Sequence, residues 1–498
     1  MPVTYFVAFL ISLMVTASLT LAVRHLAIRH GFLDRGLGSR RVHATPTPRL
    51  GGIAMVLGFF APLVGLLVVD SWVGIAFRTN TPLVLGLFGG GLAIAALGLY
   101  DDLRGTGATV KLAVQIIVGL VLYRLGVRIE LLANPFGLEI DLGVLSLPFT
   151  LLWMIGMVNA MNLIDGLDGL AAGVAFFAVV TNFLLAISRG DLVMSLMMAT
   201  LGGAILGFLI FNFNPASIFM GDTGSMFLGF VLAVSSVVTS TKSGTAVAML
   251  VPVISLGLPI MDTLLAMIRR TLIGRPMFAA DKEHIHHRLM SRLKLSHRNA
   301  VLVLYGLCCL FGLTALGLSF ANSAQSALLL AGIAVVVVVL MRKLGYLSPR
   351  RAMAGAGEQR RRNVELRSVV KEVTDAVRAS QKLSELWEAL RPLAYVLDLS
   401  RLELNVGGEE RGGGADAFQF SMTRGDAGGA LPLASAFEVR AGSRVLGTLE
   451  VSWADGREAV NRDEELALEL IADAVGDTAA RLHAHAEADP LRLVVLRK

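Results

Sequence analysis

The sequence predicts an all-α polytopic membrane protein of about eleven transmembrane helices, followed by a C-terminal cytoplasmic α+β domain. Three observations predict this class. The 498 residues are 55% hydrophobic and 16% charged, against about 25% charged in soluble domains. The mean hydropathy is +0.68. Long apolar runs recur up to residue 341 and then stop, which divides the chain into a transmembrane domain (residues 1–341), a basic linker (342–362) and a polar domain (363–498).

Each predicted span is an apolar run close to the ~20 residues that a transmembrane helix needs. In chain order the runs are residues 4–23, 53–69, 82–99, 109–126, 147–161, 169–187, 192–211, 225–240, 244–266, 301–320 and 324–341. The only two cysteines, Cys308 and Cys309, are adjacent within one run. They therefore form neither a disulfide framework nor a spaced zinc site.

The basic residues predict the orientation of these spans. One set of alternating loops holds Arg29, Arg35, Arg40 and Arg41 and the basic stretch at residues 269–298, whereas the opposite loops hold few cations. Because Lys and Arg accumulate in cytoplasmic loops, the first set is predicted to be cytoplasmic, with the N-terminus outside and the C-terminus inside. The net charge of +6 then reflects this bias, and no nucleic-acid partner is expected.

Acidic motifs follow three of the spans on the predicted cytoplasmic side. Asp101 and Asp102 follow the third span, Asp165 and Asp168 the fifth, and Asp222 the seventh. Carboxylates near the membrane are costly and usually functional. A single Asp could equally cap a helix, but three groups on one side indicate a shared site.

These side chains offer oxygen ligands for a hard cation. Asn159 and Asn162 add amide oxygens beside the carboxylates. Mg²⁺ is usually held by one or two carboxylates together with substrate phosphates. The sequence therefore predicts a Mg²⁺ site, with Mn²⁺ as the alternative metal.

Two motifs offer cations to an anionic substrate. Arg49 ends a Pro-rich loop, and His284, His286, His287 and Arg288 form a cluster after the ninth span. An ordinary positive-inside loop is the alternative for the first motif. A metal site or a solvated structural loop is the alternative for the second.

The polar C-terminal part shows helical periodicity over residues 363–395, strands at 401–406 and 436–453 around a turn at Gly442, and a second helix at 463–483. Residues 407–429 are Gly-rich and predict a mobile loop. Helix, strands and helix indicate a small α+β domain. It resembles a GAF-like sensory fold and shows no ligand or catalytic constellation.

Four motifs in order then resemble those of a known family. They are Asp101-Asp102-Leu103-Arg104-Gly105, the Asn159 to Gly169 stretch, the Asn214 to Ser225 stretch and the His284 to Leu289 stretch. They look like the signatures of the polyprenyl-phosphate N-acetylhexosamine-1-phosphate transferases (glycosyltransferase family 4). Such enzymes transfer a sugar 1-phosphate from a UDP-sugar to a membrane polyprenyl phosphate, release UMP and need Mg²⁺. The resemblance implies the bacterial inner membrane, and a homodimer is an open alternative.

The resemblance also implies a role for each matching residue. Asp222 would be the main Mg²⁺ ligand, with Asn162 or Asp165 nearby. Asp101 would position or deprotonate the lipid phosphate, with Asp102 close by, and Asp168 would contact the uridine. Phe219 would stack on uracil. The histidines and Arg288 would hold the sugar phosphates.

Several alternatives remain. The His-x-His-His motif resembles the undecaprenyl-phosphate N-acetylglucosamine-1-phosphate branch, and transfer of phospho-MurNAc-pentapeptide for peptidoglycan is the alternative. A transporter would carry ionisable groups at mid-span, where Asp262 is the main candidate. Asp262 is expected instead to support the site or to pair with Arg269. A membrane sensor would keep its function without the aspartates.

Overall fold

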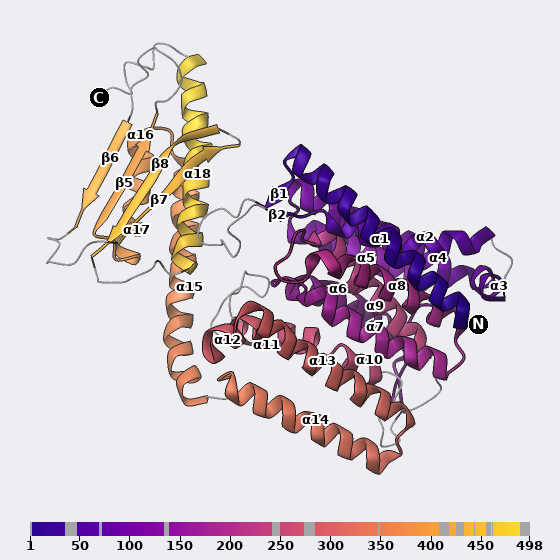
Figure 1. Cartoon of the computed structure of the whole chain (residues 1–498). Coiled ribbons are helices and arrows are strands. Elements are labelled where there is room, and N and C mark those ends of the chain that lie inside the picture. The colour runs from indigo at the N-terminus through magenta and orange to yellow at the C-terminus, as the bar shows by residue number, and fades with distance from the viewer. Residues whose placement is uncertain are drawn as a thin grey trace. The chain divides into compact units, whose positions relative to one another are not determined.

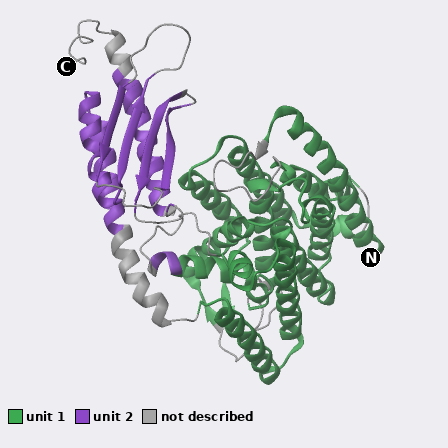
Figure 2. Cartoon of the chain, turned by 60° about the vertical axis from the view of Figure 1, so that its left-hand side comes forward, with its two compact units in different colours: residues 1–268, 280–348 green, residues 269–279, 349–498 purple. Residues whose placement is uncertain are grey.

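The computed structural model in Figure 1 contains two compact units, shown in Figure 2. Unit 1 comprises residues 1–268 and 280–348, and unit 2 comprises residues 269–279 and 349–498. The structure describes residues 2–34, 47–68, 72–133, 139–241, 250–272, 284–346, 349–407, 418–424, 433–442, 444–454, 460 and 462–488. The loop cations Arg40 and Arg41 lie outside the described residues.

Unit 1 is built from helices. Their bounds are α1 (Pro2–His30), α2 (Gly51–Val68), α3 (Trp72–Thr79), α4 (Thr81–Arg104), α5 (Ala108–Arg124), α6 (Ser146–Ile164), α7 (Leu170–Ser188), α8 (Leu192–Asn212), α9 (Gly221–Thr241), α10 (Leu250–Ser255), α11 (Gly257–Leu272), α12 (Ile285–Leu293), α13 (His297–Phe320) and α14 (Ser323–Lys343). Two short antiparallel pairs lie in the loops, namely β1 (Leu33–Asp34) with β2 (Thr47–Pro48), and β3 (Leu131–Ala133) with β4 (Glu139–Asp141).

Among the described residues, eight helices are long and apolar enough to cross a membrane: α1, α4, α6, α7, α8, α9, α13 and α14. The helical, multi-pass class predicted from sequence is therefore confirmed. The count of eleven stays a prediction, because α2 has a shorter apolar stretch, Gly51–Leu66, and α5 has only 17 residues. The ninth predicted span is divided between α10 and α11, where Gly257 and Pro259 follow the break.

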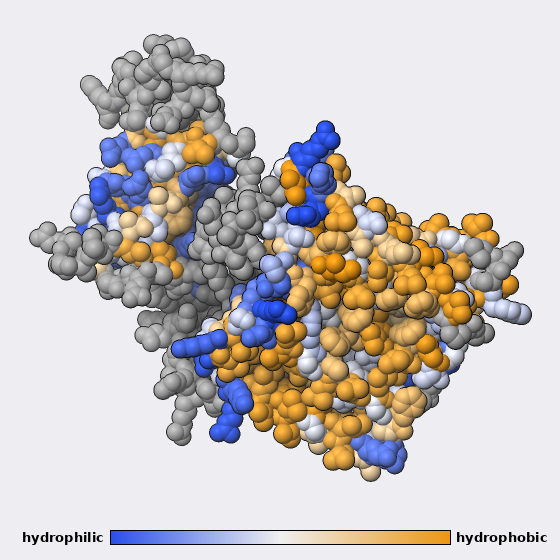
Figure 3. Space-filling view, in the orientation of Figure 1, coloured by the Kyte–Doolittle hydropathy of each residue, from blue (hydrophilic) through white to orange (hydrophobic). Residues whose placement is uncertain are grey.

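Helix α9 forms the centre of unit 1. Of the residues in its most apolar stretch, 89% are buried. Helix α9 packs against α4, α6 and α2. The corresponding window of α14 is only 11% buried, and side chains such as Val335 and Val338 are exposed. Figure 3 shows hydrophobic side chains over most of the visible face of unit 1. An apolar surface of this kind suits contact with lipid.

Unit 2 is an α+β domain, as predicted. Its elements are α15 (Pro349–Ala379), α16 (Leu383–Leu390), α17 (Pro392–Val396), β5 (Arg401–Val406), β6 (Phe418–Thr423), β7 (Leu433–Ala441), β8 (Arg444–Trp453) and α18 (Arg462–Ala488). The antiparallel sheet has the order β6-β5-β8-β7. Leu402, Leu404 and Trp453 are buried with Leu468 and Val475 of α18 in a separate core.

Two details of unit 2 extend or correct the sequence prediction. The hairpin of β7 and β8 turns at Gly442, as expected, where φ is +60°. Strand β6 lies inside the stretch predicted as a loop, because its Gly-rich flanks obscured an alternating Phe-Gln-Phe-Ser-Met-Thr pattern that carries the strand signal. The basic stretch predicted as a linker is helical from Pro349. The likeness to a GAF domain stays a prediction.

Candidate active site

The N-terminus of α9 is held against α2 and α4 by glycines. A Cβ on Gly98 would lie 2.6 Å from the carbonyl oxygen of Asp222, and one on Gly52 would lie 2.2 Å from the nitrogen of Gly224. Gly221 has a φ of +69°, and a Cβ there would lie 2.5 Å from Oδ2 of Asp102. Close backbone approach therefore brings residues far apart in the sequence to one place.

Asp102 binds the first turn of α9. Its Oδ1 accepts a hydrogen bond from the Asp222 N–H at 2.9 Å, and its Oδ2 accepts from the Thr223 N–H at 3.0 Å and the Thr223 hydroxyl at 2.7 Å. Amides at a helix N-terminus have no partner within the helix, so a carboxylate there stabilises it. Asp102 thus locks α4 to α9 and fixes the position of Asp222.

Lys111 of α5 bridges Asp101 and Asp222. It was not among the site residues predicted from the sequence. Its Nζ lies 2.7 Å from Oδ2 of Asp101 and 2.6 Å from Oδ2 of Asp222. The signal was present, because Lys111 is the cation at the start of an apolar run, and charges near the membrane are usually functional.

The two asparagines belong to the same cluster, on α6. Nδ2 of Asn162 donates to the Ser225 hydroxyl at 3.0 Å, one turn along α9 from Asp222. Nδ2 of Asn159 donates to Oε1 of Gln115 at 2.8 Å, which lies one turn along α5 from Lys111. These amides therefore connect α6 to the helices that carry the charged cluster.

Asp165 and Asp168 follow α6 but have different surroundings. Burial, with the nearby carboxylates of Asp222 and Asp102, raises the pKa of Asp165 to about 8. Asp168 is buried, and its Oδ2 accepts from Asn214 Nδ2 at 2.9 Å and the Ala216 N–H at 3.0 Å. Asp168 therefore orders the loop that leads to Phe219.

Phe219 and Arg49 are brought together by backbone pairing. The Phe219 N–H donates to the Pro48 carbonyl at 2.7 Å, and the Gly51 N–H donates to the Phe219 carbonyl at 2.9 Å. Arg49 is exposed on the paired segment. Its positive charge interacts electrostatically with Asp165 and opposes the rise in the pKa of that carboxyl. An aromatic ring and a cation thus lie at the edge of the acidic cluster.

The histidine motif is packed rather than solvated. Nδ1 of His284 lies 2.9 Å from Oδ2 of Asp262, whose Oδ1 accepts the Ile285 N–H at 2.8 Å. His286 is 2% exposed, and a Cβ on Gly166 would lie 2.9 Å from its Nε2. Burial and the neighbouring His287 lower the pKa of His286 to about 3, which keeps its ring neutral. Of the three histidines, His287 alone is more than marginally exposed.

Asp262 and Arg288 therefore have defined partners. Asp262 supports the histidine motif, as one of the two sequence-based interpretations expected. The guanidinium of Arg288, predicted to hold phosphate, donates to the Leu344 carbonyl at 3.1 Å and lies 4.0 Å from the centre of the Tyr346 ring.

The acidic cluster fits a hard divalent cation. The side chains of Asp165, Asp222 and Asn162 offer oxygen ligands. The pKa of Asp165 is raised first by burial and then by the neighbouring carboxylates, and a bound cation would offset that negative charge. Among the residues that the structure describes, no three His, Cys, Asp or Glu side chains form a closed cation site. This is compatible with Mg²⁺, which usually takes few carboxylates and completes its shell with phosphate and water.

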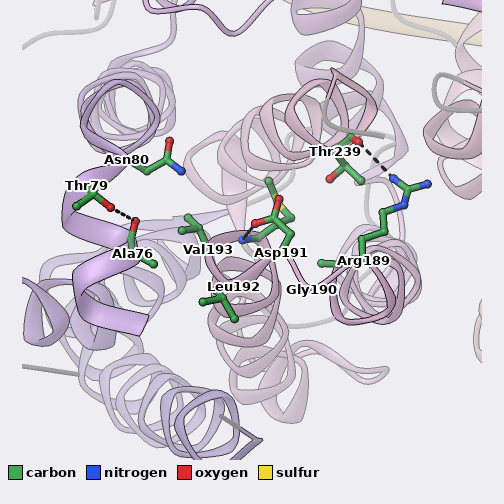
Figure 4. Close-up of a pocket in the computed structure, with 11 residues that line it drawn as sticks. Ala76, Thr79, Asn80, Arg189, Gly190, Asp191, Leu192, Val193 and Thr239 are labelled. Atoms are coloured by element: carbon green, nitrogen blue, oxygen red, sulfur yellow. Dashed lines mark hydrogen bonds between the residues drawn. The ribbon is translucent and has the colours of Figure 1, made fainter. Parts of the chain in front are cut away.

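A separate cavity, drawn in Figure 4, lies near the start of α4 and the end of α9. It has a volume of about 480 Å³ and is lined by Asn80, Arg189, Asp191 and Thr239, among others. Asn80 precedes α4 and Thr239 is near the end of α9, whereas Asp101 and Asp222 lie at the opposite ends of these helices. This cavity is therefore not part of the acidic site.

The arrangement suits phosphate chemistry. Carboxylates and one bridging lysine meet where α4 and α6 end and α9 begins, and the paired segments that carry Arg49 and Phe219 lie beside them. Phosphoryl transfer needs mainly positioning and charge neutralisation. Both requirements are met by side chains on rigid helices.

Comparison with known proteins agrees with this chemistry. Residues 84–240 match glycosyl transferase family 4. The chain is 38% identical over 347 residues to a probable undecaprenyl-phosphate N-acetylglucosaminyl 1-phosphate transferase of Bacillus subtilis, covering 69% of this chain and 93% of that protein. It is 37% identical over 360 residues to a decaprenyl-phosphate N-acetylglucosaminephosphotransferase of Mycolicibacterium smegmatis, covering 68% and 86%. A phospho-N-acetylmuramoyl-pentapeptide-transferase of Streptococcus pyogenes is 37% identical over 201 residues, covering 38% and 59%.

Proposed function

The chain belongs to glycosyl transferase family 4, and we propose that it transfers N-acetylglucosamine 1-phosphate from a UDP-sugar to undecaprenyl phosphate. UMP is the second product. The reaction would be the first membrane step in making a cell-envelope polysaccharide. The observation that carries the proposal is the Asp101–Lys111–Asp222 cluster at the ends of helices, in a chain that covers nearly the whole of a relative named for this transfer.

Each residue around the cluster would have a separate role in the transfer of the sugar phosphate. An oxygen of the lipid phosphate attacks the β-phosphorus of the UDP-sugar, and the bond from that phosphorus to the UMP oxygen breaks. Lys111 would neutralise phosphate charge, Asp101 would orient Lys111 and the lipid phosphate, and Phe219 would stack on uracil. His287 and Arg49 would face the sugar phosphates, since both retain exposed surface.

Asp222, Asp165 and Asn162 would hold Mg²⁺. When bound, Mg²⁺ would supply Lewis-acid stabilisation of the phosphate oxygens. Asp102 would act by fixing α9, because all three of its described hydrogen bonds go to Asp222 and Thr223.

The test is a direct assay of the lipid product. Purified protein is incubated with undecaprenyl phosphate, Mg²⁺ and a panel of UDP-sugars, and the lipid is weighed by mass spectrometry. The proposal expects undecaprenyl diphosphate N-acetylglucosamine with UDP-N-acetylglucosamine. Product only with UDP-MurNAc-pentapeptide would support a second candidate, transfer of phospho-MurNAc-pentapeptide, for which the partial similarity to the Streptococcus protein is weaker support. No lipid product with any donor would refute both.

The proposed location is the bacterial inner membrane, with the acidic cluster on the cytoplasmic side. The support is the bias of basic loops in the sequence. In a chain whose Cys308 and Cys309 are replaced by serine, single cysteines at Ser217 and Ser296 should react with a membrane-impermeant reagent only after the cytoplasmic face is opened. Labelling of intact cells at either position would contradict this orientation.

A further inference from the structure

The last span ends in a hydrogen-bonded turn. The Tyr346 N–H donates to the Met341 carbonyl at 2.9 Å, and the Gly345 N–H donates to the Arg342 carbonyl at 3.0 Å. Gly345 has a φ of +72°. This pair of bonds around a left-handed glycine is a Schellman motif, which stops a helix and fixes the direction of the following chain. We call residues 344–346 the terminal turn.

The terminal turn receives two arginines of α12. Arg288 donates to the Leu344 carbonyl at 3.1 Å and stacks 4.0 Å above the Tyr346 ring. Arg292 fills the space beside Gly345, where a Cβ would lie 2.3 Å from its Nη1. Leu344 is buried in the main core of unit 1. The turn is therefore a fixed support for α12.

The other end of α12 carries the histidine motif. His284 precedes the helix and pairs with Asp262. His286, in its first turn, packs against Gly166, next to Asp165. Arg288 is the residue after His287, so its two contacts at the terminal turn fix the rotation and height of the helix on which His287 sits. A shift of α12 would move His286 and His287 relative to the acidic cluster.

We propose that Tyr346 and Arg288 are positioning residues that hold the histidine motif against the acidic cluster. Arg288 thus acts through α12. The inference deepens the proposed function and rests on it, since it assigns no separate activity. The terminal turn is part of unit 1 and directly precedes unit 2 in the sequence.

The test compares Tyr346→Ala, Tyr346→Leu and Tyr346→Phe in the full chain. The control is Tyr123→Ala, because Tyr123 is also partly buried and faces an arginine, Arg128, at 6.0 Å, far from the motif. The readouts are kcat and KM for UDP-N-acetylglucosamine, the thermal midpoint, and amide hydrogen exchange of residues 285–293. Exchange reports on α12 whether or not the assay yields product.

We expect Tyr346→Ala to lower kcat/KM about tenfold and to speed exchange of α12, whereas Tyr346→Phe keeps both near wild type because the ring still faces the guanidinium. Tyr123→Ala should change neither. If Tyr346→Ala does not fold, Tyr346→Leu is compared in its place. Wild-type kcat/KM and α12 exchange in the folded variant would overturn the proposal. If the wild-type protein forms no lipid product, the proposed function is refuted. The support of α12 is then tested only by comparing amide hydrogen exchange of residues 285–293 between wild type and variants.

Discussion

The two units use charged side chains in different ways. In unit 1, Lys111 meets Asp222 across 111 residues of sequence, and Thr223 meets Asp102 across 121. In unit 2, three of the four described ion pairs join residues two or three positions apart, as in Arg391–Glu388 and Arg401–Glu403, and the fourth joins Arg424 and Asp398. Local surface pairs contribute little to stability. Long-range pairs form only when several helices are assembled, so the charged cluster of unit 1 depends on the packing of α4, α5 and α9.

Removing the charge of Lys111 or Asp222 should reduce activity more than removing the Phe219 ring or the C-terminal part of unit 2. Lys111→Met and Asp222→Asn should each lower kcat on the order of 100-fold or more, because each removes a preorganised charge at the transferring phosphate. The measurement is lipid product formed per minute from UDP-N-acetylglucosamine. The matched control is Arg128→Met, which breaks the exposed pair with Glu130 and should leave the rate unchanged. Near wild-type turnover in both site variants would place the chemistry elsewhere.

A second, smaller effect is expected at the edge of the cluster. Phe219→Ala should raise KM for the UDP-sugar by about tenfold, since stacking on a base contributes ~1–3 kcal/mol. The kcat should change less, because the uracil on which the ring would stack is not part of the transferred group. Phe320→Ala, at a 72% exposed position at the end of α13, is the control. An unchanged KM would make Phe219 a packing residue.

A third effect concerns stability and pH in Mg²⁺-free buffer. Burial and the carboxylate of Asp222 raise the pKa of Asp165 to about 8, whereas an unfolded chain loses this proton near pH 3.9. The folded state thus binds a proton that the unfolded state releases, and stability falls as pH rises between these values. Asp165→Asn should therefore raise the thermal midpoint relative to wild type, by more at pH 8.5 than at pH 5. An equal difference at both pH values would argue against the raised pKa.

Removing the C-terminal residues 349–498 of unit 2 should change the rate of transfer least. A chain that ends after Ser348 should insert and transfer sugar phosphate at a rate within about twofold of the full chain, since no described ion pair of the acidic cluster involves unit 2. The measurement is the lipid assay on protein shown to be folded by its thermal transition. If the truncated chain is folded and inserted but inactive, unit 2 is needed for catalysis and unit 1 does not carry the activity alone.

The sequence predicted the helical membrane class, the α+β tail and the residues that gather at α9. It succeeded where a pattern is local, as in apolar runs and in acids that follow them. It missed Lys111 because its partners are contributed by α4 and α9, and it missed β6 because glycines surround the strand. The contact of Arg288 with Tyr346 could not be predicted, because Tyr346 lies beyond two further helices in the sequence. The catalytic and metal-binding roles stay predictions.

The terminal turn has a consequence for how such chains can be recombined. All contacts described for the histidine motif and the acidic cluster involve residues up to Tyr346, and unit 2 resumes at Pro349. A crossover at this joint would exchange the C-terminal module and keep the support of α12 intact. A crossover only four residues earlier would delete Gly345 and Tyr346 with it. Lineages that gain or lose such a module are therefore expected to retain a glycine and an aromatic residue just after the last span.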